Sequence, residues 1–371
     1  MELQVALTNT ANKYLKGAAD NTTRNRAWLM YFVKEGRVLY NQGGTATTWN
    51  VRAREPGSQN HNSGIGITFI QPNLFEQLTV PIAGIISGAA LDMKIKMLQE
   101  AEGGALTIVN LYGDSLEATT GAAAHRLSRE FYLQNTGDDT RLMGINTPMI
   151  PDGSATVNDL VILPSSSATY GGKSVRPGAL GGTWDTNLAA ARRPSNLLSN
   201  DWPLGSGSPE YDYLTPRMLN SACPRWGSGA SDWAGNCQHM LRRAKNWTKN
   251  LSGASHSPSV ALLSQDYLDD FQDNLTIKER LTISDYGKAL GFQDDVYNYN
   301  GLFVMADYDC PAGTGFCMNA GEMSMFTIHP NMFFTKGPDL NNTALSYEMF
   351  TGMYGNLRFN PKYLTKMASY P

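Results

Sequence analysis

The sequence predicts an α+β protein, and three stretches support that prediction. Residues 45–54 (TATTWNVRAR) and 76–82 (EQLTVPI) alternate between two sides, which is the period-two pattern of half-buried strands. Residues 104–135 repeat small or apolar side chains at spacings of three and four, which indicates one long helix. Near the C-terminus, 301–334 combines apolar, strand-like runs with a Pro/Gly turn. Strands and helix therefore come from different stretches of the chain.

The two alternating segments predict a β-ribbon. They are separated by EPGSQNHNSGIG, which contains the Gly, Pro and Asn typical of a long turn. A two-stranded ribbon is only marginally stable alone in water. We therefore expect this ribbon to rest on another surface, such as the next subunit of an assembly.

Two helices are predicted after the ribbon. Ser87 suits the N-cap of a helix over 88–102, which Gly103-Gly104 would close. The second helix covers 104–135 and would be roughly 48 Å long, enough to form a spine for the molecule. Its small or apolar face consists of Leu106, Val109, Gly113, Leu116, Thr120, Ala123 and Leu127.

The other stretches predict an arm and a mixed lobe. At the N-terminus, the apolar cluster in 28–33 fits an arm that docks on another surface. The segment 165–182 is expected to be a flexible loop, and 236–250 an amphipathic helix with a solvated basic face. SVALLSQDYLDDF predicts a buried strand followed by a short helix, and 301–306 and 323–329 predict further strands.

Composition limits the classes of function. The chain has 371 residues, more than one hydrophobic core usually fills, so two lobes or one body with long extensions are expected. Its net charge of −3 argues against tight sequence-specific DNA binding, which needs concentrated positive charge. Charged residues make up 17%, below the roughly 25% typical of soluble domains, so the surface can be buried against neighbours at little desolvation cost. Without a long apolar run or a signal-peptide pattern, we expect a soluble protein that is not secreted.

Patterns for catalysis and cofactors are weak. Gly113-Asp114-Ser115-Leu116 matches the nucleophile block of GDSL esterases, but it lies inside the helical period, and no histidine has an acidic residue three positions before it. No complete dinucleotide, phosphate-loop or EF-hand motif occurs. We therefore expect no catalytic residue, cofactor or metal. The four cysteines are too sparse for a disulfide framework, and free thiols are expected at Cys223, Cys237, Cys310 and Cys317.

The C-terminal block arranges its turn residues in a specific order. An apolar strand ends at Asp307, a Pro-x-Gly turn follows at Pro311 and Gly313, and the next apolar strand leads into Asn319. This order resembles the corresponding block of the tailed-phage major capsid protein family.

Further segments resemble that family in the same order along the chain. Gly43-Gly44 followed by TTWNV is similar to the glycine pair that opens the family's extended loop. The segment from Ala105 to Asn135 is similar to its spine helix, and that from Tyr347 to Met367 to its C-terminal strand and tail. The resemblance covers nearly the whole chain, and the order of the motifs is a stronger argument than any single motif.

The resemblance implies the Hong Kong 97-type phage capsid fold and its division into parts. These are an N-terminal arm (1–40), an extended β-ribbon loop (41–80), a peripheral domain (81–145 and 335–371) with the spine helix 104–135, and an axial domain (146–334). The resemblance further implies a structural protein without an active site. It would assemble with itself into hexamers and pentamers of an icosahedral head around double-stranded DNA.

The same resemblance implies partners and contacts. The partners are the portal, decoration or separate scaffolding proteins, and packaged DNA held non-specifically, in a virion assembled in the host cytoplasm without a membrane. No isopeptide cross-link through an extended-loop lysine is expected, because 41–93 contains no lysine. Since the arm starts at Met1, we expect any scaffold to be a separate protein. The candidates for contacts between subunits are Trp28, Tyr31, Phe32, Trp49, Arg52, Arg54, Phe69 and Phe75.

Three alternatives remain open at the level of sequence. An encapsulin-type shell would hold cargo protein instead of DNA, so nucleic acid in purified particles discriminates it. A GDSL-type serine hydrolase would show activity that depends on Ser115. A carbohydrate-binding or adhesive β module, suggested by the 17 Tyr and 7 Trp, would be a trimer or monomer without a closed shell.

Overall fold

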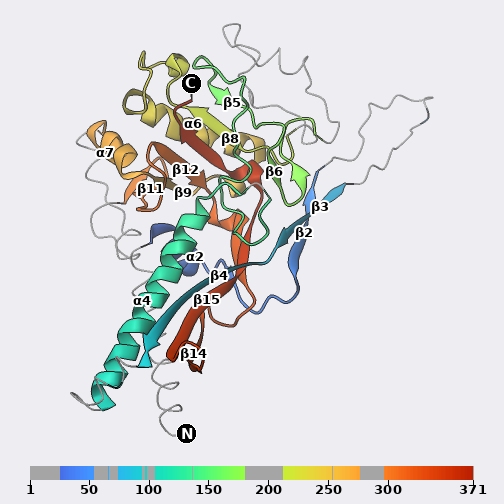
Figure 1. The fold of residues 1–371 in the computed structure, drawn as a ribbon. Helices are drawn as coiled ribbons and strands as arrows, with labels where there is room; N and C mark the ends of the chain where they lie inside the picture. Colours follow the sequence, from blue (N-terminus) through green and yellow to red (C-terminus); the bar gives the residue numbers. More distant parts are fainter. Residues whose placement is uncertain are drawn as a thin grey trace.

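The computed structural model describes residues 26–53, 66, 74–93, 97, 105–135, 137–179, 212–252, 254–275 and 296–370. These residues form two large β-sheets, a two-stranded ribbon, a short hairpin and a long helix (Figure 1). The predicted α+β class is confirmed. The short 3-10 helices are η1 (Pro224–Trp226), η2 (Ala254–His256), η3 (Ala320–Glu322) and η4 (Pro361–Tyr363).

The larger sheet has seven strands in the order β10-β11-β9-β12-β16-β8-β5. Its strands β8 and β9 are buried at every position, and β9 accordingly appears in the sequence as a continuous apolar run without alternation, whereas β8 also buries Arg217 and Asn220. The strands predicted at 301–306 and in SVALL are confirmed. The bounds are β5 (Val161–Ile162), β8 (Arg217–Asn220), β9 (Val260–Leu263), β10 (Tyr297–Tyr299), β11 (Leu302–Ala306), β12 (Thr314–Met318) and β16 (Thr365–Ala368).

Helices α6 (Trp233–Ser252) and α7 (Gln265–Asp273) pack on this sheet. Trp233 of α6 stacks on Tyr267 of α7, with 4.2 Å between the ring centroids. The buried side of α6, including Leu241 and Trp247, joins the core that contains β9. The amphipathic helix and the short helix after β9 are therefore confirmed, and Arg242 lies exposed on the polar side of α6.

The second sheet has five strands, and its long strand β15 (Ser346–Phe359) pairs with three of the others. Helix α4 (Ala105–Phe131) packs along β4 and β15, as Figure 1 shows. This confirms the predicted spine helix, and Gly113, Leu116, Thr120, Ala123 and Leu127 of its predicted apolar face are all buried. The other strands are β1 (Val38–Leu39), β4 (Ala83–Asp92), β13 (Met323–Thr327) and β14 (Phe334–Asn341).

The helix predicted over 88–102 is wrong in its first part. Residues through Asp92 belong to β4, which pairs with β15 from Ala83↔Gly355 to Asp92↔Ser346. Ser87 lies opposite Thr351 in this ladder and caps no helix. The long partner strand satisfies the backbone of β4, so tertiary pairing overrides the local helical preference. Residues 94–96 and 98–104 lie outside the described part.

Strand pairing differs from the expected division into domains at two places. Strand β13 was expected in the axial domain, but it pairs with β15 of the five-stranded sheet. Strand β16 was expected in the peripheral domain, but it lies between β12 and β8 of the seven-stranded sheet. The chain therefore crosses between the two sheets more often than the linear division implies.

The expected flexible loop at 165–182 forms a small hairpin in its described part, 165–179. Strands β6 (Thr169–Tyr170) and β7 (Lys173–Ser174) pair with each other. Between the sheets, the buried Tyr170 ring stacks on Phe359 with 4.3 Å between centroids. Its hydroxyl donates to the Leu357 carbonyl at 3.2 Å and accepts from the Phe359 N–H at 3.1 Å. One buried aromatic side chain thus anchors a segment whose composition is typical of a loop.

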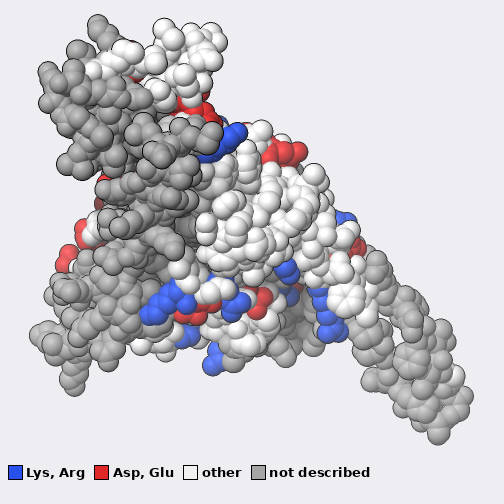
Figure 2. All heavy atoms as spheres, turned by 90° about the horizontal axis from the view of Figure 1, so that it is seen from below, with Lys and Arg blue, Asp and Glu red and all other residues white. Residues whose placement is uncertain are grey.

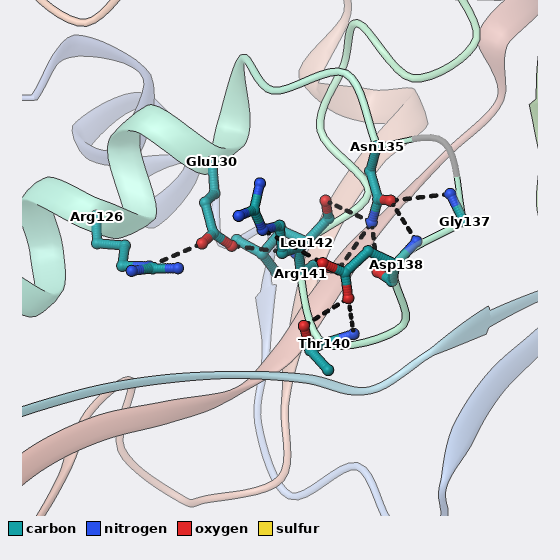
Figure 3. A network of polar contacts seen from close by, with 8 residues as sticks. All are labelled: Arg126, Glu130, Asn135, Gly137, Asp138, Thr140, Arg141 and Leu142. Carbon is teal, nitrogen blue, oxygen red and sulfur yellow. Dashed lines mark hydrogen bonds and ion pairs between the residues drawn. The ribbon is translucent and has the colours of Figure 1, made fainter.

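A polar network stabilises the turn that follows α4 (Figure 3). The Asn135 amide donates to the carbonyls of Asp138 and Leu142 at 2.7 and 3.3 Å, and Glu130 accepts from the Leu142 N–H at 3.1 Å. These bonds return the chain to the end of the helix. There Gly144 lies so close that a Cβ atom would come within 2.4 Å of the Leu133 carbonyl oxygen.

Candidate assembly surfaces

Helix α2 (Ala27–Lys34) places three of the predicted contact residues in the chain's own core. Trp28, Tyr31 and Phe32 are buried, and Trp28 has no exposed surface. The Trp28 ring stacks on Phe131 at 4.1 Å, and its indole N–H donates to the Ser128 hydroxyl at 3.0 Å. These side chains therefore have no surface left for a second subunit, and their assignment to inter-subunit contacts is corrected. Residues 1–25 of the predicted arm lie outside the described part.

The loop after β11 holds the start of α2. The Trp28 backbone N–H donates to Asp307 at 3.2 Å, and Arg26 forms an ion pair with Asp309 at 2.8 Å. Asp307 is buried, and this burial raises the pKa of its carboxyl. The aspartate of the Pro-x-Gly block thus has a structural role, because it holds the N-terminal helix against the end of α4.

The predicted ribbon is confirmed and leads away from the body (Figure 1). Strands β2 (Ala46–Arg52) and β3 (Phe75–Pro81) pair antiparallel, with Trp49 opposite Leu78. Leu78 and Val80 are fully buried, so this end of the ribbon is packed on the body and forms its root. Of the segment between the two strands, only Leu74, Gly66 and Ala53 are described.

Two side-chain contacts hold the ribbon root. The guanidinium of Arg358, in β15, lies 5.2 Å from the centroid of the half-buried Trp49 ring. Lys173 of β7 forms an ion pair with Glu76 of β3 at 2.9 Å. The hairpin that the sequence presented as a loop is therefore the brace of the ribbon.

A close backbone approach completes this brace. The Thr79 N–H donates to the Gly171 carbonyl at 3.2 Å. Gly171 has a φ of +57°, and a Cβ atom there would lie 3.0 Å from the Cβ of Leu78. Both the left-handed conformation and the short distance favour glycine at this position.

The remaining predicted contact residues belong to the ribbon. Phe75 is 52% exposed at the far end of β3, and Arg52 is exposed at the end of β2. Trp49 is half-buried at the root. Arg54 and Phe69 lie outside the described residues. The exposed Phe75 ring is the strongest candidate among these for a contact that the single chain does not complete.

One surface was missed by the sequence analysis. Ile86 of β4 is 53% exposed and Tyr354 of β15 is 40% exposed, on the side of the five-stranded sheet opposite α4. Phe334 stacks on Tyr354 at 5.3 Å, and the Tyr354 ring covers Gly84, whose Cβ would come within 2.7 Å of it. The alternating burial of β4 is the signal that would have revealed this face, had the segment not been predicted as a helix.

The visible surface charge is mixed. Figure 2 shows basic and acidic side chains close together on one face, with large areas that carry neither. Among the described residues visible on that face, basic side chains form no continuous surface of the kind that tight nucleic-acid binding requires. Within the described ranges, no helix has the length and apolar character needed to cross a membrane.

The described residues do not assemble the chemistry of the hydrolase alternative. Ser115 lies in the middle of α4, and no described histidine hydrogen-bonds to it. The four cysteines are free and buried, and burial raises the pKa of Cys310 and Cys317 to about 12, which disfavours the reactive thiolate. No group of three or more His, Cys, Asp or Glu that could hold a metal occurs among the described residues.

The chain matches known proteins in structure, whereas comparison by sequence finds no match. No protein-family model and no curated protein matches the chain. Among solved structures, the capsid of the Myoviridae phage XM1 is similar with a TM-score of 0.50 and 11% identity, covering 92% of each chain. The cyanophage A-1(L) capsid asymmetric unit has a TM-score of 0.56 and 13% identity over 90% of each chain. The capsid of a native GTA particle has a TM-score of 0.51 and 11% identity, covering 92% of this chain and 90% of its own.

Each of these similarities covers at least 90% of this chain and therefore spans most of its fold. The chain therefore has the Hong Kong 97-type fold of tailed-phage capsid proteins.

Proposed function

We propose that this chain is the major capsid protein of a tailed-phage head, assembling into hexamers and pentamers of an icosahedral shell that encloses double-stranded DNA. The observation that carries this proposal is the likeness in fold to capsid structures over at least 90% of both chains. Because those chains are only 11 to 13% identical to this one, the function is argued from fold and surfaces together.

The surfaces support assembly in physical terms. A closed shell requires that each interface recur by symmetry, and elements that reach across neighbours make many modest interfaces act together. The described part of the ribbon packs on its own chain through Leu78 and Val80 and exposes Phe75 farther out. The outer face of the five-stranded sheet exposes Ile86 and Tyr354. In a shell, both surfaces would be covered by other copies.

The finer features follow from the same proposal. The ribbon acts as the extended loop, with Trp49, Arg52, Arg54, Phe69 and Phe75 as its contact candidates, and the chain performs no catalysis. The shell holds DNA non-specifically and joins a portal, with decoration or scaffolding proteins supplied separately. It assembles in the host cytoplasm and remains in the virion.

Negative-stain electron microscopy of the chain expressed alone, with a lysate control, tests the proposal. We expect uniform closed particles or separate hexamers and pentamers. A stable monomer at all salt and protein concentrations, also after addition of a scaffold from the same source, would contradict it. Nucleic acid in particles purified from infected cells distinguishes a DNA-filled head from a shell that holds cargo protein.

A further inference from the structure

A cavity of about 490 Å³ lies at the root of the ribbon. Its walls come from β1, β2, η3, η4 and the end of β15, so it is located where the ribbon meets the body. The charged side chains that line it are Arg37, Arg52, Arg358, Lys362 and Glu322. Four cations thus face one carboxylate in this cavity.

Among the described residues, two of these four cationic side chains have no carboxylate partner. Glu322 pairs with His256 outside the cavity wall at 2.5 Å, and Lys362 lies 3.9 Å from Asp212. Arg52 and Lys362 make further contacts within the chain. Among the described residues, neither Arg37 nor Arg358 forms an ion pair with a carboxylate.

Arg37 also has an unsatisfied donor. Its Nε is buried and has no hydrogen-bond partner in the described structure. A buried donor without an acceptor costs free energy, more so when the group is charged. The guanidinium geometry matches the two oxygens of a carboxylate or phosphate group. The arginines that line the cavity are therefore suited to bind a group with paired anionic oxygen atoms.

We propose that this cavity binds an Asp or Glu side chain of a second copy of the chain. The proposal rests on the proposed function, because it requires that copies assemble. The chain has 33 acidic against 30 basic residues, so a shell of identical copies offers carboxylates in excess. Duplex DNA is stiff on the length scale of a protein and carries its phosphates on a broad cylinder, whereas one side chain can enter a cavity of this size.

Binding there would connect the ribbon to the body. Arg52 and Trp49 belong to β2, whereas Arg358 belongs to β15. Arg358 also lies over the Trp49 ring of β2, so a carboxylate held between Arg358 and Arg37 would act on the ribbon through that contact. The angle of the ribbon would then depend on whether a neighbouring copy is docked.

Zero-length cross-linking of the full chain tests this inference. The charge-conserving variants R37K and R358K place an amine in the cavity, and a carbodiimide joins an amine only to a carboxylate in contact with it. Assemblies are made from an equal mixture of ¹⁵N-labelled and unlabelled protein. We expect linked peptides of mixed isotope content that join position 37 or 358 to an Asp or Glu. The matched control R129K places an amine on the exposed side of α4, outside the cavity.

The outcomes separate this inference from the function on which it rests. Cross-links within one isotope only would assign the cavity to the same chain, and assembled particles without cross-links at these positions would show that no carboxylate docks there. Either result overturns the inference and leaves the capsid function intact. Packaged DNA that shields the amines at positions 37 and 358 from the reagent, but not the control amine at position 129, would also overturn it. A wild-type chain that never assembles would contradict the function itself.

A charge reversal gives a second, independent measurement. We expect R358E to raise the protein concentration needed for assembly by roughly tenfold, since it removes one member of a charged pair across an interface. R129E should leave that concentration unchanged within twofold. Equal effects of the two variants would contradict a specific role for the cavity.

Discussion

Two tryptophans define two different environments in this molecule. Trp28 has no exposed surface, stacks on Phe131 and uses both its indole and backbone N–H groups within the chain. Trp49 is half-buried at the ribbon root, where it contacts the guanidinium of Arg358 and the ring of Tyr170. The chain buries Trp28 completely by itself, whereas it leaves part of Trp49 exposed. The comparison teaches that an aromatic cluster in the sequence does not reveal which of its members face a partner.

The largest expected difference between the two regions concerns stability. W28A should lower the free energy of unfolding by about 3 to 5 kcal/mol, because it leaves a cavity between α2 and α4 and an unpaired Ser128 hydroxyl. W49A should cost only about 1 kcal/mol in the unassembled chain, since its ring is partly solvated. Urea unfolding of the unassembled protein measures both losses of stability.

The conservative variant W28F controls for the size of the side chain. It keeps most of the stacking on Phe131 and should recover more than half of the loss caused by W28A. If W49A destabilised the single chain as much as W28A does, the distinction between a completed and an open region would be wrong.

A smaller effect is expected at the backbone contact of the ribbon brace. G171A should cost about 2 to 3 kcal/mol, because alanine is strained at a φ of +57° and its Cβ would press on Leu78. Gly172 is the matched control, since it has a φ of +79° but no atom within 4 Å of an added Cβ. G172A should therefore cost only about 1 kcal/mol. Thermal unfolding of both variants gives the difference, and equal losses would mean that the contact with Leu78 does not constrain the brace.

The parts of the fold that were predicted from the sequence share one property. The ribbon, α4 and α6 each carry a hydrophobic period, β9 is a short continuous apolar run, and these patterns depend on local geometry alone. The helix predicted after Ser87 was wrong through Asp92, because the backbone of that part finds a partner in β15, more than 250 residues away in the sequence, whereas Met93 and Met97 are helical. Strands β13 and β16 also lie in a different sheet from the one expected, for the same reason: each pairs with a strand from elsewhere in the chain.

The candidate contact residues show a similar limit. The sequence identifies Trp28 and Phe75 equally well as large aromatic side chains near predicted extended segments. Only the packing of α2 on α4 shows that Trp28 is buried, whereas Phe75 remains 52% exposed. The basic cavity was also missed, because Arg37 and Arg358 are more than 300 positions apart in the sequence and meet only through strand pairing.

The stability of the body is expected to depend on pH through one buried lysine. Lys366 of β16 lies in the seven-stranded sheet, and burial lowers the pKa of its amine to about 8. In the unfolded chain an ordinary lysine has a pKa of about 10.4. The folded state therefore binds fewer protons between pH 8 and 10.4, so this group destabilises the fold below pH 8 and the penalty fades as pH rises through that window.

K366M should remove this penalty. We expect the variant to be more stable than wild type by about 1 kcal/mol at pH 7, with the difference shrinking toward pH 10. Urea unfolding of both proteins at both pH values measures this difference. A difference that does not change with pH would mean that the amine of Lys366 is solvated in the folded protein.

The smallest effect is expected for the ion pair that braces the ribbon. Lys173 and Glu76 meet at 2.9 Å, but the lysine side chain is 38% exposed, so solvent screens the pair. E76Q should lower the stability of the single chain by about 0.5 kcal/mol or less, and 1 M NaCl should abolish the difference. The pair Arg126 and Glu130 on α4 provides the control, because its arginine side chain is 59% exposed and R126Q should show a similarly small, salt-sensitive change. The two variants should differ in assembly, however, because only E76Q loosens the element that reaches toward a neighbour. If both variants assembled equally well, the brace would be a feature of the single chain alone, and the open character of the ribbon root would rest on Trp49 and the basic cavity.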